Sequence, residues 1–445
     1  MLIFAAQAGA AAFVYAMLVA LLYRFPSAGV GLVLGVFVAE AVAISFSSLG
    51  LGPIDAYPQD IVFVALGGAG AARLLFGGRL SLLQLVWLLF GALVVLSFVR
   101  GVGLFGVNLA GVEVREYVYL FAGVLYFMTV PAGPRFLRRL VTLWVFVAGV
   151  LLSLTLLRWA LIGLGLSGGA QWVPTAGVSS LRVLDSAQTL FLAQALLIGL
   201  YLWLVPGHAL MWRFLTGLLL PAVVLLQHRT VWIATAAALA LVFLFERRLR
   251  GLVLPVLVGS ALAGMVMALF LFAGDANIVT QSLEASAAEA VNTENSTFLW
   301  RLESWRVLLG GDYLSGYVEY LIGRPFGAGY ERYMPSLGME INVSPHNFYI
   351  QTLLRTGVLG LVVLILVYAS LLLRLHRLRF RGMGESFSPR LALVLLVTQL
   401  VYSLSYPLNY EQGILLGVAA SVAWSATRER TRRTKRVRVV WKTPA

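Results

Sequence analysis

Residues 346–373 read HNFYIQTLLRTGVLGLVVLILVYASLLL, and this stretch decides the class of fold. Its first residues are polar, and a nearly unbroken apolar run follows. A helix of about 20 predominantly apolar residues is long enough to cross the hydrocarbon core of a bilayer. The stretch therefore predicts a transmembrane helix that starts where a long polar loop re-enters the membrane.

Similar apolar runs recur along most of the chain. Of the 445 residues, 60% are hydrophobic and 12% are charged, whereas soluble domains average about 25% charged residues. The runs lie near residues 2–23, 29–48, 59–76, 80–99, 115–130, 140–164, 184–205, 211–227, 229–246, 251–273, 346–373, 391–406 and 412–427. They predict an all-α polytopic membrane protein with about 12–14 transmembrane helices and one large external loop containing an amphipathic helix.

The runs divide the chain into four parts. About ten spans cover residues 1–273, a large loop covers 274–345, the C-terminal spans cover 346–427, and a basic tail covers 428–445. The arginine-rich short loops fall on the same side as the tail, which the positive-inside rule makes cytoplasmic. We therefore expect the loop 274–345 to be external. The first run lacks the basic start of a signal peptide, so we expect it to be retained.

The tail accounts for much of the net charge of +14. Nucleic acid is one partner for such a basic run, but beside a membrane span the anionic lipids of the cytoplasmic leaflet are a simpler one. The run also fits a topology signal that has no specific partner.

His346 is the candidate general base. Ser344 suits a helix N-cap and Pro345 the first helical position, which places His346 in the first turn of a helix at the membrane face. A helix N-terminus disfavours an added positive charge, so the imidazole should stay neutral and able to accept a proton. The alternative is an interfacial histidine that caps the helix or bonds a carbonyl.

Several arginines fall on the predicted external side, where topology makes them scarce. They are Arg182, Arg229, Arg301, Arg306, Arg324 and Arg332. A guanidinium pairs bidentately with phosphate and keeps its charge, so several around one cavity would suit a diphosphate. Alternatively, these side chains snorkel, or they pair with the acids of the loop.

The large loop has two predictable elements. Leu299, Leu302, Trp305, Leu308 and Leu309 follow a helical period, which predicts an amphipathic helix that lies on the membrane face or covers a cavity. Further on, the glycine-rich segment Gly323-Arg-Pro-Phe-Gly-Ala-Gly-Tyr330 predicts a tight turn.

Four stretches around this loop resemble motifs of the O-antigen ligase and polysaccharide polymerase superfamily. They are Arg229-Thr-Val-Trp-Ile233, Ser296 to Trp305, Gly323 to Tyr330, and His346-Asn-Phe-Tyr349 with Arg355-Thr-Gly357 and Gly360. Arg182 before Asp185-Ser-Ala-Gln188 is a weaker match, because the family has a Pro-Asn pair there. Ile233 also replaces a commoner leucine. The resemblance covers about residues 180–360.

The resemblance implies an inverting glycosyltransferase that needs no metal and no cofactor. Its donor would be a glycan on undecaprenyl diphosphate, used at the periplasmic face of the bacterial inner membrane. The acceptor would be a glycolipid: lipid A–core in an O-antigen ligase, which we favour, or another lipid-linked glycan in a polymerase.

The resemblance also implies roles for individual residues. His346 would accept the proton of the acceptor hydroxyl, and Arg229 and Arg301 would bind the diphosphate. Arg182 and Arg324 would add to substrate binding, and Asn347 and Tyr349 would orient sugar or imidazole. These are the expected site residues.

Two other classes of function compete with this interpretation. A lipid or glycan transporter needs ionisable groups or broken helices near the bilayer midplane. Glu40 is the only carboxylate deep inside a predicted span, and no pair of interrupted helices is evident. A scaffold would not explain a cluster of outward-facing cations. Because cysteine is absent, thiolate catalysis is excluded.

Overall fold

A computed structural model describes most of the chain. The described residues are 2–42, 49–51, 54–77, 80–164, 166, 171–175, 178–203, 209–246, 251, 297–310, 313–336, 338–378 and 388–425. The predicted span at 251–273 (apart from Gly251), the first part of the loop and the basic tail lie outside these residues.

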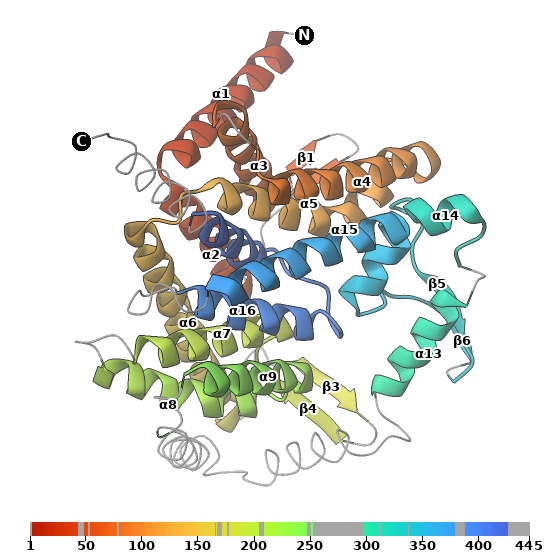
Figure 1. The fold of residues 1–445 in the computed structure, drawn as a ribbon. Helices are drawn as coiled ribbons and strands as arrows, with labels where there is room; N and C mark the ends of the chain where they lie inside the picture. Colours follow the sequence, from red (N-terminus) through yellow and green to blue (C-terminus); the bar gives the residue numbers. More distant parts are fainter. Residues whose placement is uncertain are drawn as a thin grey trace, which may run out of the picture.

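The described chain is predominantly helical (Figure 1). The labelled helices are α1 (Leu2–Arg24), α2 (Pro26–Ala41), α3 (Pro58–Phe76), α4 (Leu82–Phe105), α5 (Val107–Thr129), α6 (Pro134–Gly163), α7 (Ser186–Leu202), α8 (Ala209–Leu225), α9 (Arg229–Phe245), α13 (Thr297–Leu309), α14 (Tyr317–Ile322), α15 (Phe348–Leu378) and α16 (Pro389–Tyr402). A further apolar helix covers Gln412–Ser425. The predicted all-α class is confirmed.

The helices overlap the predicted spans wherever the chain is described. Four of them, α3, α4, α6 and α15, are each long and apolar enough to cross a bilayer. α1 and α2 qualify together as one broken span or a re-entrant loop, bent by 116°. Five further apolar helices have only 10–17 residues. The described part is thus a multi-pass membrane protein with four full-length spans, or five if the bent pair counts as one.

Polar residues at helix starts fix where the helices begin. Asp185 caps α7 by accepting a hydrogen bond from Gln188 N at 2.7 Å, while Gln188 Oε1 accepts one from Asp185 N at 3.2 Å. This reciprocal capping box satisfies backbone donors that the first turn leaves free. The segment that departs from the family's Pro-Asn pattern therefore has a folding role.

α7 lies at the centre of the bundle. Its residues from Ala187 to Leu202 are all buried, and it packs against α6, α8, α9 and α16. A helix that is apolar on every side is a core helix. The polar residues at its start are therefore carried by a tightly packed element.

Glu40 does not lie where the sequence indicated. The run at 29–48 placed it deep inside a span, but α2 ends at Ala41 and Glu40 is exposed. Its carboxylate accepts hydrogen bonds from Gln59 Nε2, at 2.8 Å, and from the Tyr410 hydroxyl. A carboxylate at a helix end does not supply the midplane group that a transporter would need.

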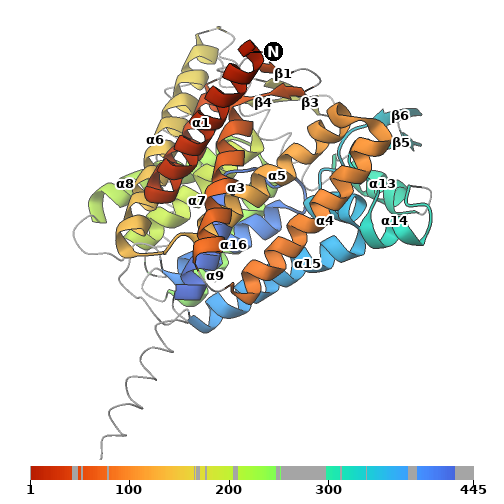
Figure 2. The same ribbon diagram turned by 90° about the horizontal axis from the view of Figure 1, so that it is seen from above.

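Among the described residues, three antiparallel hairpins connect helices. β1 (Leu49–Leu51) pairs with β2 (Ile54–Ala56), β3 (Gln171–Thr175) with β4 (Val178–Arg182), and β5 (Glu331–Met334) with β6 (Met339–Asn342). The β3–β4 and β5–β6 hairpins lie at the same end of the bundle as α13 and α14 (Figures 1 and 2). Segments far apart in sequence therefore gather at this end.

The predicted loop helix is present as α13. Leu308 is fully buried, but Leu299 and Leu309 are 40% and 43% exposed. The expected apolar stripe is therefore only partly used for packing. The helix contacts β5, which fixes its position over the end of the bundle.

α15 is not the continuous helix that its apolar run predicts, because it is broken at Gly357, where φ is 67° and ψ is −172°. A Cβ at Gly357 would lie 2.2 Å from the backbone of Leu321, and one at Gly323 would lie 2.4 Å from the backbone of Arg355. The residue after Gly323 donates its N–H to Leu354 O at 2.8 Å. The glycine-rich turn therefore sits directly on the break and satisfies one of the carbonyls there.

Candidate functional site

The segment around His346 differs from its sequence-based prediction. α15 begins at Phe348 rather than Pro345. Asn347 is the cap, because its Oδ1 accepts hydrogen bonds from Tyr349 N and Ile350 N, each at 3.0 Å. The prediction that Ser344 caps the helix and that His346 lies in its first turn is therefore wrong.

His346 adopts a left-handed backbone conformation, with φ at 49°. Neighbouring elements hold it there. Trp305 Nε1 of α13 donates to Pro345 O at 2.6 Å, and Asn347 Nδ2 donates to Leu404 O at 3.0 Å. These bonds fix the residues on both sides of the histidine. They therefore outweigh the local preference of Ser344 and Pro345 for starting a helix.

Two aromatic rings flank the imidazole. The ring centroids of Trp300 and Tyr406 each lie 6.4 Å from that of His346. Arg301 joins the group, with its guanidinium carbon 5.1 Å from the Tyr406 ring centroid. All four side chains are partly exposed, so a substrate can approach them. His346 and Arg301, predicted to share a site, do lie together.

His346 is neutral, as predicted, but for another reason. Burial, with the positive charges of Arg301 and Arg332, lowers its pKa to about 4. The predicted cause was the helix dipole, which acts within the first turn of a helix. His346 precedes that turn, so neighbouring cations and desolvation take its place.

Side-chain contacts lead from Tyr406 to the start of α7. Tyr406 stacks on Tyr402, with ring centroids 5.1 Å apart. The hydroxyls of Tyr402 and Ser186 are 2.9 Å apart. Ser186 follows Asp185, whose carboxyl has a pKa raised by burial. A chain of direct contacts thus joins the histidine to the best-packed helix.

Arg182 and Arg229 are associated with a second histidine, His228. His228 is at the N-cap position of α9 without a side-chain capping bond, and Arg229 is the first residue of that helix. His228 Nε2 donates to Leu184 O at 3.0 Å. Burial and the charge of Arg182 lower the pKa of His228 to about 4. Leu184 lies two residues before Ser186, so this second group adjoins the chain of contacts that leads to His346.

The other expected site residues have structural contacts. The amide of Asn347 is used for capping and for the bond to Leu404. The Tyr349 hydroxyl donates to Leu400 O at 3.0 Å. Arg324 stacks on Tyr313, with its guanidinium carbon 4.5 Å from the ring centroid. These contacts assign the three residues to holding the loop rather than to touching sugar.

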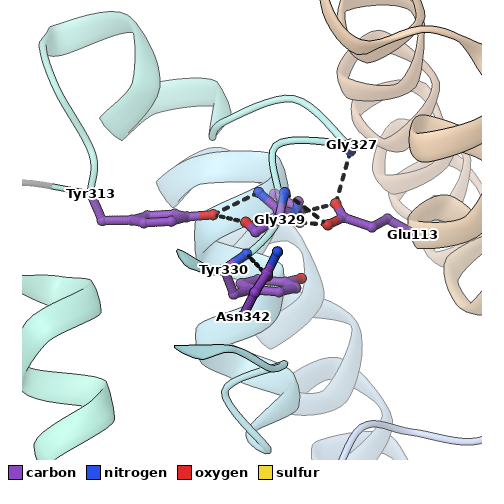
Figure 3. A network of polar contacts seen from close by, with 7 residues as sticks. Glu113, Tyr313, Gly327, Gly329, Tyr330 and Asn342 are labelled. Carbon is purple, nitrogen blue, oxygen red and sulfur yellow. Dashed lines mark hydrogen bonds and ion pairs between the residues drawn. The ribbon is translucent and has the colours of Figure 1, made fainter. Parts of the chain in front are cut away.

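A buried network anchors the glycine-rich turn (Figure 3). Arg355 is fully buried and forms an ion pair with Glu113 of α5, in which Nε and Oε2 are 2.9 Å apart. Glu113 also accepts hydrogen bonds from Gly327 N and Gly329 N, at 2.9 and 3.0 Å. Arg355 donates to Gly329 O and to the Tyr313 hydroxyl. The network ties the glycine-rich turn to α5 and α15.

Sequence reasoning did not assign a site role to Trp300 and Tyr406, which flank His346, or to Arg332, whose charge acts on it. Trp300 lies inside a matched stretch without being singled out, Tyr406 looked like the end of a span, and Arg332 was one arginine among several. No local pattern marks them, because they meet only through the fold. Among the described residues, no group of three or more His, Asp or Glu side chains is placed to hold a metal ion.

This arrangement combines a neutral, partly exposed imidazole with positive guanidinium groups. The imidazole can take a proton from a hydroxyl. The guanidinium groups can stabilise an anion that forms or binds nearby.

Comparison with known proteins gives one family match. Residues 214–365 match a family described as O-antigen ligase. The match includes Arg229, Arg301 and His346, together with the glycine-rich turn and the break in α15. No curated protein matches the chain.

Proposed function

Since the chain belongs to the O-antigen ligase-like superfamily through residues 214–365, we propose that it is an inverting membrane glycosyltransferase. It moves a glycan from undecaprenyl diphosphate to a hydroxyl of lipid A–core, at the periplasmic face of the bacterial inner membrane. The hydroxyl oxygen attacks the anomeric carbon, and the bond from that carbon to the diphosphate oxygen breaks. Undecaprenyl diphosphate leaves, and the hydroxyl proton passes to His346.

The environment of His346 carries this proposal. The side chain is partly exposed and unprotonated at neutral pH, and its backbone is held on both sides. A rigid neutral imidazole is suited to accept a proton in a positioned reaction, a contribution worth roughly 10²–10⁴ in rate.

Arg301 supports the diphosphate assignment. Its guanidinium lies in the same group as His346, and none of the ion pairs within the described chain involves it. Charge grows on the leaving diphosphate at the transition state, and a fixed guanidinium stabilises it. Arg182 and Arg229, in the adjoining group, would extend the same positive surface along the diphosphate.

The orientation of the enzyme rests on charge. The basic loops and the tail 428–445 would face the cytoplasm, where anionic lipids attract them. The His346 group would then face the periplasm, where a lipid-linked glycan is presented.

The test is transfer by purified protein in lipid nanodiscs supplied with an undecaprenyl-diphosphate glycan and lipid A–core. Wild type should form the glycosylated product, and His346→Ala should lose about 10²–10⁴ in rate while still binding donor. His346→Gln keeps a hydrogen-bonding side chain but cannot act as a base, so it should be impaired similarly. Turnover by His346→Ala close to wild type would refute the assignment of the base.

The acceptor is tested in the same assay. Supplying only the lipid-linked glycan separates a ligase from a polymerase, because a polymerase lengthens the glycan without lipid A–core. Glycan lengthening in this arm would replace the ligase assignment with the polymerase one. Absence of product in both arms from folded wild-type protein would refute the transferase proposal.

A further inference from the structure

Arg332 is a buried cation close to His346. Along β5 exposed and buried residues alternate, and Arg332 lies on the buried face with Met334. The residue as a whole is 6% exposed. The strand is packed against α13, the helix that carries Arg301.

The guanidinium of Arg332 is only partly satisfied. Nη1 donates to Tyr330 O at 2.7 Å and to Val343 O at 2.8 Å. Within the described part of the chain, Nε and Nη2 have no hydrogen-bond partner, and no acid forms an ion pair with this arginine. A buried charge without a counter-ion is costly. Its position therefore calls for an explanation beyond packing.

The groups that face His346 are known from each element around it. α13 contributes the cation Arg301, and β5 contributes the cation Arg332. The segment after α16 contributes the phenol of Tyr406, which has a ring contact with the imidazole. The described chain thus places two positive charges and no carboxylate against this base.

The two cations near His346 affect its protonation when an anion binds. A diphosphate beside an imidazole favours its protonated form, and a protonated imidazole cannot accept the proton of the acceptor. A fixed positive charge near the ring offsets the effect of the anion. Arg332 can do this through space, because its unsatisfied nitrogens are shielded from direct contact with a ligand.

We propose that Arg332 is a positioning residue that keeps His346 unprotonated while the anionic donor is bound. It acts through its charge and through its bond to Val343, three residues before the histidine. This inference rests on the proposed function of the site, and it assigns to Arg332 a role in the protonation state of the base.

The first test is the pH dependence of kcat at saturating donor, which reports the donor complex. In Arg332→Met, the acid limb should move to higher pH by roughly one pH unit. Removing a cation favours the protonated imidazole, so activity should fall most at low pH and recover at high pH. Arg332→Lys keeps the charge and should keep most of the wild-type profile. Arg306→Met, an exposed arginine on α13, is the matched control and should change nothing.

Two results would overturn the inference. An equal loss at every pH in Arg332→Met would make the residue purely structural. A raised donor KM with an unchanged pH profile of kcat would make it a direct ligand of the diphosphate.

A second measurement does not depend on transfer. Histidine NMR in nanodiscs, with His346 identified by comparison with His346→Gln, gives its protonation with and without inorganic diphosphate. With diphosphate present, Arg332→Met should protonate at higher pH than wild type. An unchanged titration would refute the inference. The expected shift in a protein without transferase activity would support the inference while refuting the proposed function.

Discussion

Two buried arginines of the same end of the molecule differ in how their charge is compensated. Arg355 has the carboxylate of Glu113 as its partner, and carbonyl and hydroxyl oxygens take further N–H groups (Figure 3). Arg332 has two backbone carbonyls and, within the described residues, no acid. The charge of Arg355 thus has a counter-ion, while Arg332 leaves an uncompensated positive charge near His346.

This difference separates arginines that hold the fold from arginines that serve the reaction. A guanidinium that is fully buried and paired with a carboxylate, like that of Arg355, is not available to bind a phosphate. Arg301, which stacks on Tyr406 and is partly exposed, has both charge and access. Residue type alone could not make this distinction, because all three residues are arginines and only the fold decides which of them has a carboxylate partner.

The largest expected effect is the loss of stability when the Arg355–Glu113 ion pair is broken. Arg355→Met leaves the Glu113 carboxylate without its partner, and breaking a buried ion pair in this way costs about 3–5 kcal/mol. The thermal unfolding midpoint of the protein in detergent should fall markedly. The double variant Glu113→Leu/Arg355→Met should recover part of the loss. A single variant as stable as wild type would contradict the anchoring role.

The next largest effect is on donor binding by Arg301, which has no carboxylate partner among the described residues. Arg301→Lys keeps the charge but loses bidentate geometry. A charge-assisted hydrogen bond contributes about 1.5–3 kcal/mol, so the donor KM should rise about tenfold or more. The unfolding midpoint should stay near that of wild type. A lowered midpoint with an unchanged KM would place Arg301 among the structural arginines.

The pH dependence of kcat/KM for donor tests whether the positive charges near His346 act on it, because kcat/KM reports the pKa of the base in the free enzyme. His346 has a pKa lowered to about 4, so it is protonated only below that pH. Activity should therefore persist at pH 5.5, where an ordinary histidine with a pKa of about 6.5 would already have lost about tenfold. An acid limb near pH 6.5 would show that neither burial nor the two cations lower the pKa of the imidazole.

The smallest effect concerns the helix start. Asn347→Ala removes the cap of α15 and should destabilise the protein by about 1 kcal/mol. Asn347→Asp can still accept the two backbone bonds and should be milder. Comparing their unfolding midpoints checks the structural role. If both variants bind donor poorly with unchanged stability, Asn347 contacts substrate.

The sequence was sufficient for the class of fold and for the order of the helices, because apolar runs of membrane length are a strong signal. It also indicated that His346 and Arg301 share a site. It failed at the start of α15, where Ser344 and Pro345 match a local rule. The bonds of Trp305 and Asn347, which come from the tertiary fold, overrule it.

The break in α15 was missed for a similar reason. Gly357 lies in an apolar run that looks continuous, and only the close approach of Leu321 shows why glycine is needed there. The roles of Glu113 and Arg332 also depend on distant partners. Charge compensation between residues more than 200 positions apart, as for Glu113 and Arg355, leaves no local pattern to recognise.

The most direct test of the account is the stabilisation of purified protein by inorganic diphosphate, which raises the unfolding midpoint if it binds the folded state. We predict that diphosphate raises the midpoint of wild type. In Arg301→Gln the basal midpoint should stay near that of wild type while the rise is lost. In Arg355→Met the basal midpoint should fall while a rise remains. Loss of the rise in Arg355→Met, together with a full rise in Arg301→Gln, would contradict the division between paired and unpaired arginines.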